Sequence, residues 1–369
     1  MRNSVIMGFI GQLVNSWHQK QQECFGGLVA ALMKGGRLGV AAIGRHRRSK
    51  TSEKHDIKAV DRFLGNRKIQ LLELWAGLIA QAVTRQNRLL VLLDWTDLHD
   101  GRHEVLVAAV SFGGRALPIA WTTSEKSQYT RSRNSIEVSL CTVLKTLLPA
   151  GVELVIVADR GFGRASFFKA LRRRKIRFII RIRRDVHIID QRGHGAVHHR
   201  RVRRGQTRDL INCQYSDNQR IEVRCVITFG EGQGRNRPQT PWYLVTDFSD
   251  EELSAHAIVA GYKLRMRIEH SFRDHKSLRF GFQLRSVSLS HRDRYDRLLA
   301  IAAAALLLLV LVGLSAERRG LARTFRANTA AVRTHSLLFL GLAFLSRLHT
   351  RPSSLMLCRA FDRPFAGIG

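Results

Sequence analysis

Two short apolar runs, each followed directly by an aspartate, restrict the folds open to this chain more than any other feature. LLVLL at 89–93 precedes Asp94, and LVIVA at 154–158 precedes Asp159. Runs of this length and composition are typical of strands buried on both faces, and such strands occur in α/β sheets covered by helices. Open α/β sheets carry their chemistry at the carboxyl ends of strands. The sequence therefore predicts an α/β fold with an aspartate at each of two such ends.

The segments around these runs indicate the order of the elements. Asp100–Gly101 is a hairpin signal after the first run. The patterns predict strands over 105–112 and 116–122, a helix over 134–148, a helix over 166–174 and a strand over 178–182. Three antiparallel strands followed by helix, strand, helix and strand are the order of an RNase H-like core, whose first and fourth strands lie side by side. Asp94 and Asp159 are therefore expected to be neighbours, although Asp97 and Asp100 compete with Asp94.

A third stretch, YKLRMRIEHSFRDHK at 262–276, combines polar side chains at helical spacing. On one continuous helix, Tyr262, Arg265, Glu269 and Lys276 fall within a sector of about 60°. A carboxylate beside a phenol, a guanidinium and an ammonium suits phosphodiester chemistry, because the acid can hold a metal ion and the cations can hold phosphate oxygens. The alternative interpretation is an exposed helix whose charges form i,i+4 pairs.

The charge of the chain indicates its partner. Lys and Arg number 61 against 29 Asp and Glu, for a formal net charge of +32, which is rare in an enzyme that acts on small molecules. The charge is spread along the whole chain, which favours nucleic acid over a membrane surface. Five cysteines without a C-x-x-C pair argue against a disulfide framework or a zinc site and fit a reducing cytoplasm. The first residues show no apolar segment followed by a cleavage site, so we expect no signal peptide.

The most apolar segment, Leu298–Leu314, challenges the expectation of a soluble protein. Its 17 uncharged residues are at the lower limit for spanning a bilayer. Arginines flank both ends, so the charges give no preferred orientation across a membrane. We expect a helix buried in the core of a large domain and no membrane partner. A membrane-associated basic protein is the weaker hypothesis.

Together, the three stretches resemble the signature of a known family. Tyr-x2-Arg-x3-Glu-x6-Lys at 262–276 resembles the motif of the IS4-type DDE transposases of insertion sequences. Asp94-Trp95-Thr96 looks like the D-x-T of that family, and the four residues from Asp159 look like its D-R-G-F form. The resemblance implies that Asp94, Asp159 and Glu269 are the catalytic acids. They would bind two divalent ions, Mg²⁺ with Mn²⁺ as a substitute.

The resemblance, which covers roughly residues 45–350, also implies roles for further side chains. Arg265 and Lys276 would hold phosphates near the scissile bond, and Tyr262 would add a hydrogen bond. Trp242 would stack on a base displaced from the DNA end, and a tryptophan of the core is the alternative. The resemblance further implies cut-and-paste transposition, with double-stranded DNA cleaved at terminal inverted repeats through a hairpin intermediate and joined to target DNA in a synaptic homodimer. Such a protein works in the bacterial cytoplasm, at the nucleoid, without a small-molecule substrate.

The chain divides into three regions. Residues 1–85 are predicted to be helical, and their 14 Lys and Arg against 5 Asp and Glu suit binding of DNA ends. Residues 86–290 would form the catalytic domain, with a β-rich insertion at about 184–250 that resembles the insertion of the family. Residues 172–237 hold 18 Lys and Arg against 6 Asp and Glu, and we expect this region to face DNA. Residues 291–369 are predicted to be helical and to pack on the core or on a second subunit.

The densest basic cluster of the insertion consists of Arg200, Arg201, Arg203 and Arg204. We expect it to face DNA, with a solvated basic loop as the alternative. Two hypotheses of function remain at this point. The first is an active DDE transposase, and the second is a catalytically silent DNA-binding protein derived from one. The three acids favour the first.

Overall fold

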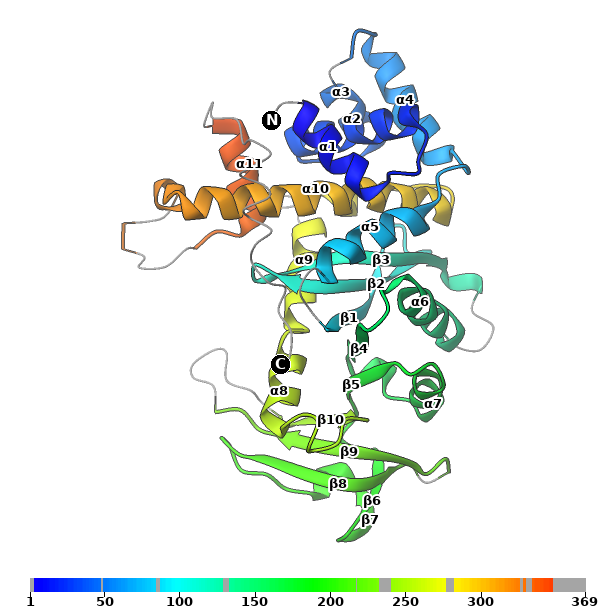
Figure 1. Cartoon of the computed structure of the whole chain (residues 1–369), viewed down its shortest axis with the longest axis vertical. Coiled ribbons are helices and arrows are strands. Elements are labelled where there is room, and N and C mark those ends of the chain that lie inside the picture. Colours follow the sequence, from blue (N-terminus) through cyan, green and yellow to red (C-terminus); the bar gives the residue numbers. More distant parts are fainter. Residues whose placement is uncertain are drawn as a thin grey trace.

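The computed structural model describes residues 3–347 except 48, 84–86, 129–132, 217, 232–239, 277–281, 326–327 and 330–333, and it does not describe the side chains at 3–4, 273–276 and 285. One mixed sheet runs through the described part of the molecule, from β3 below the helices at the top of Figure 1 to β7 at the bottom. Its ten strands have the order β3-β2-β1-β4-β5-β10-β9-β8-β6-β7. They are β1 (Arg88–Asp97), β2 (His103–Phe112), β3 (Arg115–Glu125), β4 (Glu153–Ala158), β5 (Arg177–Arg181), β6 (His187–Asp190), β7 (Gly193–Ala196), β8 (Thr207–Tyr215), β9 (Ile221–Thr228) and β10 (Trp242–Thr246).

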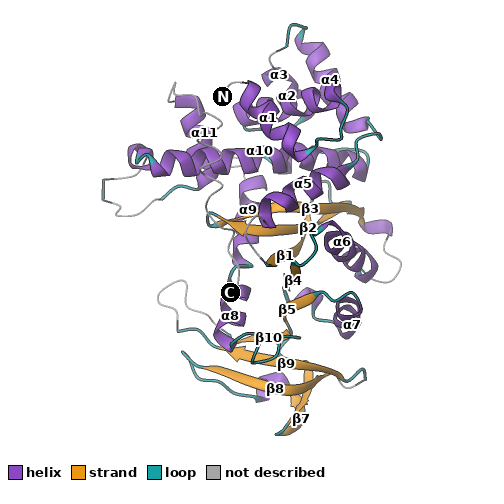
Figure 2. Cartoon of the chain, viewed as in Figure 1, coloured by secondary structure: helices purple, strands orange, loops and turns teal. Residues whose placement is uncertain are grey.

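Helices cover both faces of the upper half of this sheet and its β3 edge (Figures 1 and 2). α8 and α9 lie on one face, and α6 and α7 lie on the other. α10 runs between β3 and the N-terminal helices. Every residue of β2, which lies between β1 and β3 in the sheet, is buried. The helices are α1 (Asn3–Leu13), α2 (Gln19–Gly35), α3 (Val40–His46), α4 (Glu53–Gly65), α5 (Leu71–Val83), α6 (Asn134–Leu147), α7 (Ala165–Arg173), α8 (Ala255–Lys263), α9 (Met266–Lys276), α10 (Arg292–Arg318) and α11 (Leu337–Arg347), with the short 3-10 helices η2 (Arg160–Phe162) and η5 (Leu284–Ser286) among the connections.

The first four strands pair as the predicted order of elements implies. β1 pairs antiparallel with β2, β2 pairs antiparallel with β3, and β1 pairs in parallel with β4. The expectation that the first and fourth strands lie side by side is confirmed. The predicted end of the first strand is wrong, because β1 continues past Asp94 to Asp97. β4 stops pairing at Ala158, but β2 remains a partner of β1 over these further residues.

The predicted β-rich insertion extends this sheet instead of forming a separate one. β10 pairs antiparallel with both β5 and β9, and β8 connects β9 to the β6–β7 hairpin. The sequence of the insertion leans towards strand at 186–189, 208–214, 220–229 and 242–246. Four strands, β6, β8, β9 and β10, coincide with these segments. β7, with the sequence GHGA, could not be predicted, because two glycines, a histidine and an alanine give no alternating pattern.

The apolar segment Leu298–Leu314 lies inside α10, and each of its residues except Leu299 is buried. α10 is long and apolar enough to cross a membrane, but its apolar surface packs against β3, α2, α4 and α11. The expected core helix is therefore confirmed. Its crossing with α11 is close, since a Cβ at Gly313 would lie 2.1 Å from the carbonyl oxygen of Leu337.

Gly77 allows α5 to pack directly on α1. A Cβ at this position would lie 2.3 Å from the carbonyl oxygen of Leu13, which is backbone and cannot rotate away. We expect Gly77→Ala to lower the free energy of unfolding by about 1–3 kcal/mol in urea melts, because the two helices must separate. Gly8→Ala, on the exposed side of α1 with nothing within 4 Å of the added methyl, is the control and should stabilise by about 0.5–1 kcal/mol. Equal effects of the two substitutions would contradict the close packing.

Arg200 differs from the other arginines of the predicted basic cluster. Its side chain is 7% exposed and donates two hydrogen bonds to the carboxylate of Asp190, at 2.9 and 3.0 Å. Arg201, Arg203 and Arg204 are exposed. The expectation that the cluster faces DNA is therefore wrong for Arg200, whose guanidinium closes the β6–β7 hairpin.

Replacing Arg200 tests this structural role. We expect Arg200→Gln to lower the free energy of unfolding by about 3–5 kcal/mol at neutral pH, because it leaves the Asp190 carboxylate buried without its cation. The hydrogen bonds from Arg200 hold the pKa of Asp190 below its ordinary value of 3.8. The contribution of the pair is therefore fully present above that pH and is lost as the pH falls below it, so the difference between wild type and variant should narrow steadily in melts at decreasing pH below 3.8. Arg201→Gln should change stability by less than about 0.5 kcal/mol, and a loss as large as that of Arg200→Gln would contradict the assignment.

Candidate active site

Asp94 and Asp159 are adjacent because of the register between β1 and β4. The parallel pairing ends with Leu93 opposite Ala158, so the next residue on each side is an aspartate. Asp94 continues in β1 with β2 as its neighbour. Asp159 leaves the sheet and caps η2, and its Oδ1 accepts a hydrogen bond from the Gly161 N–H at 2.8 Å. The prediction that the two acids are neighbours is confirmed.

The guanidinium of Arg265 connects both aspartates to Glu269. Its Nη2 lies 2.8 Å from Asp94 Oδ2 and 3.7 Å from Asp159 Oδ2. Its Nη1 donates to Glu269 Oε1 at 2.9 Å. The Arg265 side chain is 9% exposed, against 14% for Asp94, 33% for Asp159 and 47% for Glu269. Acids from β1, from the end of β4 and from α9 therefore gather around one buried cation.

This crowding alters the ionisation of the acids. Burial raises the pKa of Asp94 to about 6; Arg265 opposes the shift, and the carboxylates of Asp159 and Glu269 add to it. Burial lowers the pKa of Arg265, but its contacts with the acids, Asp94 foremost, raise the pKa above its ordinary value and keep the side chain charged. Three carboxylates and one guanidinium carry a net charge of −2 when all are ionised. Such a site attracts cations.

The helix that carries these residues is interrupted. α8 ends and α9 begins around Leu264 and Arg265, whose N–H groups bond to carbonyls three residues back, at 3.2 and 3.0 Å. The predicted single helical face is therefore wrong, because Tyr262 belongs to α8 while Glu269 and Lys276 belong to α9. Despite this break, Arg265 still pairs with Glu269, which lies four residues later in α9.

Tyr262 and Trp242 pack on each other. Tyr262 is 1% exposed, and burial raises the pKa of its hydroxyl, while the nearby guanidiniums of Arg265 and Arg181 oppose that shift. The ring of half-buried Trp242 meets that of Tyr262 edge to face, with centroids 5.0 Å apart. Tyr262 is thus a core residue in this conformation, and its expected hydrogen bond to DNA has no exposed hydroxyl to use. Base stacking by Trp242 stays a prediction, and the Lys276 side chain lies outside the described residues.

The competitors of Asp94 have other partners. Asp97 is 71% exposed and pairs with Lys126 at 2.7 Å. Asp100 accepts hydrogen bonds from His103 Nδ1 at 2.6 Å and from the hydroxyl of Tyr295 at 2.8 Å, in the turn between β1 and β2. Of the three aspartates on this stretch, Asp94 is the one that shares Arg265 with Asp159.

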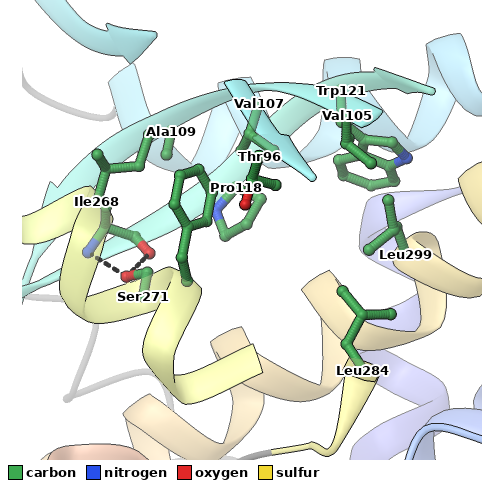
Figure 3. A pocket seen from close by; sticks show the side chains of 12 residues that line it. Thr96, Val105, Val107, Ala109, Pro118, Trp121, Ile268, Ser271, Leu284 and Leu299 are labelled. Carbon is green, nitrogen blue, oxygen red and sulfur yellow. Dashed lines mark hydrogen bonds between the residues drawn. The ribbon is translucent and has the colours of Figure 1, made fainter. Parts of the chain in front are cut away.

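An apolar pocket lies beside the acids, between β1–β3, α9 and α10 (Figure 3). Thr96, two residues after Asp94 in β1, lines it together with Ile268 and Leu284. Ser271 at its rim is occupied by hydrogen bonds to the backbone of Ala116. No ionisable side chain is among the described residues that line the pocket. The pocket offers no group for phosphodiester chemistry. The candidate active site is therefore the acid cluster, that is, Asp94, Asp159 and Glu269 around Arg265.

Residues 128–308 match a family model described as a transposase DDE domain. The match supports a DDE transposase family. The matched segment contains Asp159, Arg265 and Glu269 and starts after Asp94. The family match does not cover Asp94, so the assignment of Asp94 to the candidate site depends on its position next to Asp159. No curated protein matches the chain.

DDE transposase domains generally use divalent metal ions. Among the described residues, no group of three or more His, Cys, Asp and Glu side chains is arranged so that it could hold a metal ion, because the three acids contact Arg265 instead. Their chemistry nevertheless fits such an ion. They are hard oxygen donors that together carry excess negative charge over the one guanidinium of Arg265.

Glu137 and Arg164 contact the segments that carry the two aspartates, and neither was predicted. Glu137 opens the buried stripe of α6, which continues with Leu140, Cys141 and Leu144. An acid in an apolar stripe with these spacings is a signal of a buried, partnered charge. No comparable pattern marks Arg164.

Proposed function

We propose that this chain is a cut-and-paste transposase of the IS4 type, which cleaves DNA at terminal inverted repeats and joins the ends to target DNA. The observation that carries the proposal is the meeting of Asp94, Asp159 and Glu269 at the Arg265 guanidinium. The strand order β3-β2-β1-β4-β5, with α6 and α7 as the connecting helices, supports an RNase H-like core within the catalytic domain.

Asp94, Asp159 and Glu269 would hold divalent ions, Mg²⁺ with Mn²⁺ as a substitute. When bound, such ions activate a water or a 3′-OH and stabilise the leaving oxygen of the phosphodiester. The protein supplies the geometry, since β1 fixes Asp94 and the Gly161 N–H orients Asp159. Glu269 is half exposed, where a DNA strand can reach it. No covalent protein–DNA bond is required, because a hydroxyl group is the nucleophile.

Arg265 has two roles in this proposal. In the protein alone its guanidinium offsets the repulsion between the three carboxylates. On DNA, the same planar group would bind phosphate oxygens near the scissile bond, for which its paired N–H donors are suited. Lys276 would hold a neighbouring phosphate, and Trp242 would stack on a displaced base.

Double-stranded DNA is the proposed partner, both as terminal repeats and as target. The exposed arginines Arg201, Arg203 and Arg204 and the basic helical region 1–85 supply positive charge for its backbone. Catalysis would take place in a synaptic homodimer, at the nucleoid of the bacterial cytoplasm. The region 291–369 would pack on the core or on the second subunit.

The test is strand cleavage of a labelled duplex carrying the inverted repeats that flank this gene, with Mg²⁺, Mn²⁺ or EDTA. The expected result is cleavage at the repeat ends that requires a divalent ion. DNA binding without nicking under either ion would replace the proposal with a catalytically silent DNA-binding protein.

A further inference from the structure

Glu137 is a buried acid that contacts neither Arg265 nor the three proposed catalytic carboxylates. It lies in the first turn of α6, on the face of the sheet opposite α9. Its side chain is 2% exposed. Its Oε1 accepts a hydrogen bond from Trp95 Nε1 at 2.9 Å, and its Oε2 forms an ion pair with Arg164 Nη2. One carboxylate therefore binds two partners from two different segments of the chain.

Each partner is connected to a proposed catalytic aspartate, Trp95 directly and Arg164 through Gly161. Trp95 follows Asp94 in β1, and its backbone N–H donates to Asp94 Oδ1 at 3.0 Å. Arg164 Nη1 donates to the carbonyl oxygen of Gly161 at 2.5 Å, and the Gly161 N–H donates to Asp159 Oδ1 at 2.8 Å. These hydrogen bonds therefore connect one aspartate to the other through Trp95, Glu137, Arg164 and Gly161.

We propose that Glu137 is a positioning residue that sets the separation and orientation of Asp94 and Asp159 from behind the sheet. The inference rests on the proposed function, since it concerns the same two carboxylates. Arg265 reaches these aspartates from the α9 face, whereas Glu137 acts from the α6 face. Outer partners of this kind orient metal ligands, and their loss typically weakens metal affinity or activity by about 10–100-fold.

The surroundings of Glu137 restrain its partner Trp95 and oppose the loss of its charge. The guanidinium of Arg133 covers the Trp95 ring at 5.0 Å from the centroid, which restrains the indole on its other side. Burial raises the pKa of Glu137, and the Trp95 hydrogen bond and the Arg164 guanidinium oppose that shift. A carboxylate buried in this way is retained only with partners, and both of its partners belong to the segments that carry Asp94 and Asp159.

The test uses Glu137→Gln in the full chain. A glutamine keeps an acceptor for Trp95 but presents its amide donors to Arg164, so it breaks the Asp159 half of the connection. Mn²⁺ binding to the protein without DNA is measured by electron paramagnetic resonance, together with kcat and KM for DNA cleavage and the melting temperature. We expect Mn²⁺ affinity and kcat to fall about 10-fold or more while KM for DNA stays within about 2-fold. Unchanged Mn²⁺ affinity and kcat would overturn the inference.

Glu153→Gln is the matched control. Glu153 pairs with Arg88 at 2.6 Å and links the same two strands, β1 and β4, at their opposite ends. If Glu137 only holds the strands together, both variants lower the melting temperature and neither changes Mn²⁺ binding. If Glu137 positions the aspartates, it alone changes Mn²⁺ binding.

Trp95→Phe provides a second, milder variant in case Glu137→Gln does not fold. It keeps an aromatic ring under Arg133 but removes the indole N–H, so it breaks the Asp94 half of the connection. The same loss of Mn²⁺ affinity is expected, and wild-type affinity would overturn the inference. A wild-type protein that neither binds Mn²⁺ nor cleaves DNA would instead refute the proposed function, and the inference with it.

Discussion

A protein with Glu269→Gln is expected to bind DNA like the wild type and to cleave it at least about 10³-fold more slowly. Glutamine keeps the size of the side chain but is a poor ligand for a divalent ion. Such an ion lowers the activation free energy of phosphodiester cleavage by several kcal/mol. Each 1.36 kcal/mol of activation free energy corresponds to a tenfold change in rate. The fold should be unaffected. Glu269 is 47% exposed, and an i,i+4 pair of this kind contributes only about 0.3–0.5 kcal/mol.

Cleavage and gel shift are measured on the same labelled terminal duplex, with Mg²⁺ and with Mn²⁺. Glu251→Gln, at an exposed glutamate before α8, is the control because it changes the net charge by the same amount away from the acid cluster. It should cleave at the wild-type rate. Wild-type cleavage by Glu269→Gln would remove this residue from the active site, and an equal loss of DNA binding would assign it to substrate binding.

The part of the sheet formed by β1–β5 is predictable from the sequence because short apolar runs and turn residues mark each of its strands. Apolar runs before Asp94 and Asp159 predict buried strands, and the order of strands and helices predicts which strands are neighbours. The proximity of the two acids then follows from the register of β1 and β4, without knowledge of any other side chain. The buried α10 is predictable for a similar reason, since an apolar segment of this length must be covered by something.

The helix break between Tyr262 and Glu269 could not be predicted in this way. The residues at the break, Leu264 and Arg265, are neither glycine nor proline, and the spacing of the motif fits an uninterrupted helix. The break depends on tertiary contacts. Tyr262 packs in the core against Trp242 while Arg265 pairs with acids on two strands. Both contacts join residues far apart in the sequence.

The roles of individual charges are equally dependent on distant partners. Arg200 and Arg201 are neighbours of the same type, yet one is buried on Asp190 and the other is exposed. Only the β6–β7 hairpin, whose β7 strand has no sequence signal, brings Asp190 to Arg200. A charge count therefore predicts a nucleic-acid partner for the region but does not identify which arginines are free to contact it.

Asp94→Asn is expected to abolish DNA cleavage as completely as Glu269→Gln, by about 10³-fold or more, whereas Asp97→Asn is expected to leave it within about 2-fold. The family match begins after both residues, so the choice between them depends on geometry. Asp94 is the residue next to Asp159 in the register of β1 and β4, and it shares Arg265 with Asp159 and Glu269. Asp97 is exposed and pairs with Lys126.

The two variants are compared for cleavage and for Mn²⁺ binding, with the melting temperature as the check on folding. Asparagine is close in shape to aspartate and retains one acceptor for Arg265, so Asp94→Asn should fold. Loss of cleavage in Asp97→Asn with activity kept in Asp94→Asn would move the first acid three residues along β1. It would also require that the end of β1 rearrange on DNA, because Asp94 and Asp97, an odd number of residues apart in a strand, point to opposite faces of the sheet. Since Glu269 and Arg265 approach from the α9 face, the pleat of β1 favours Asp94.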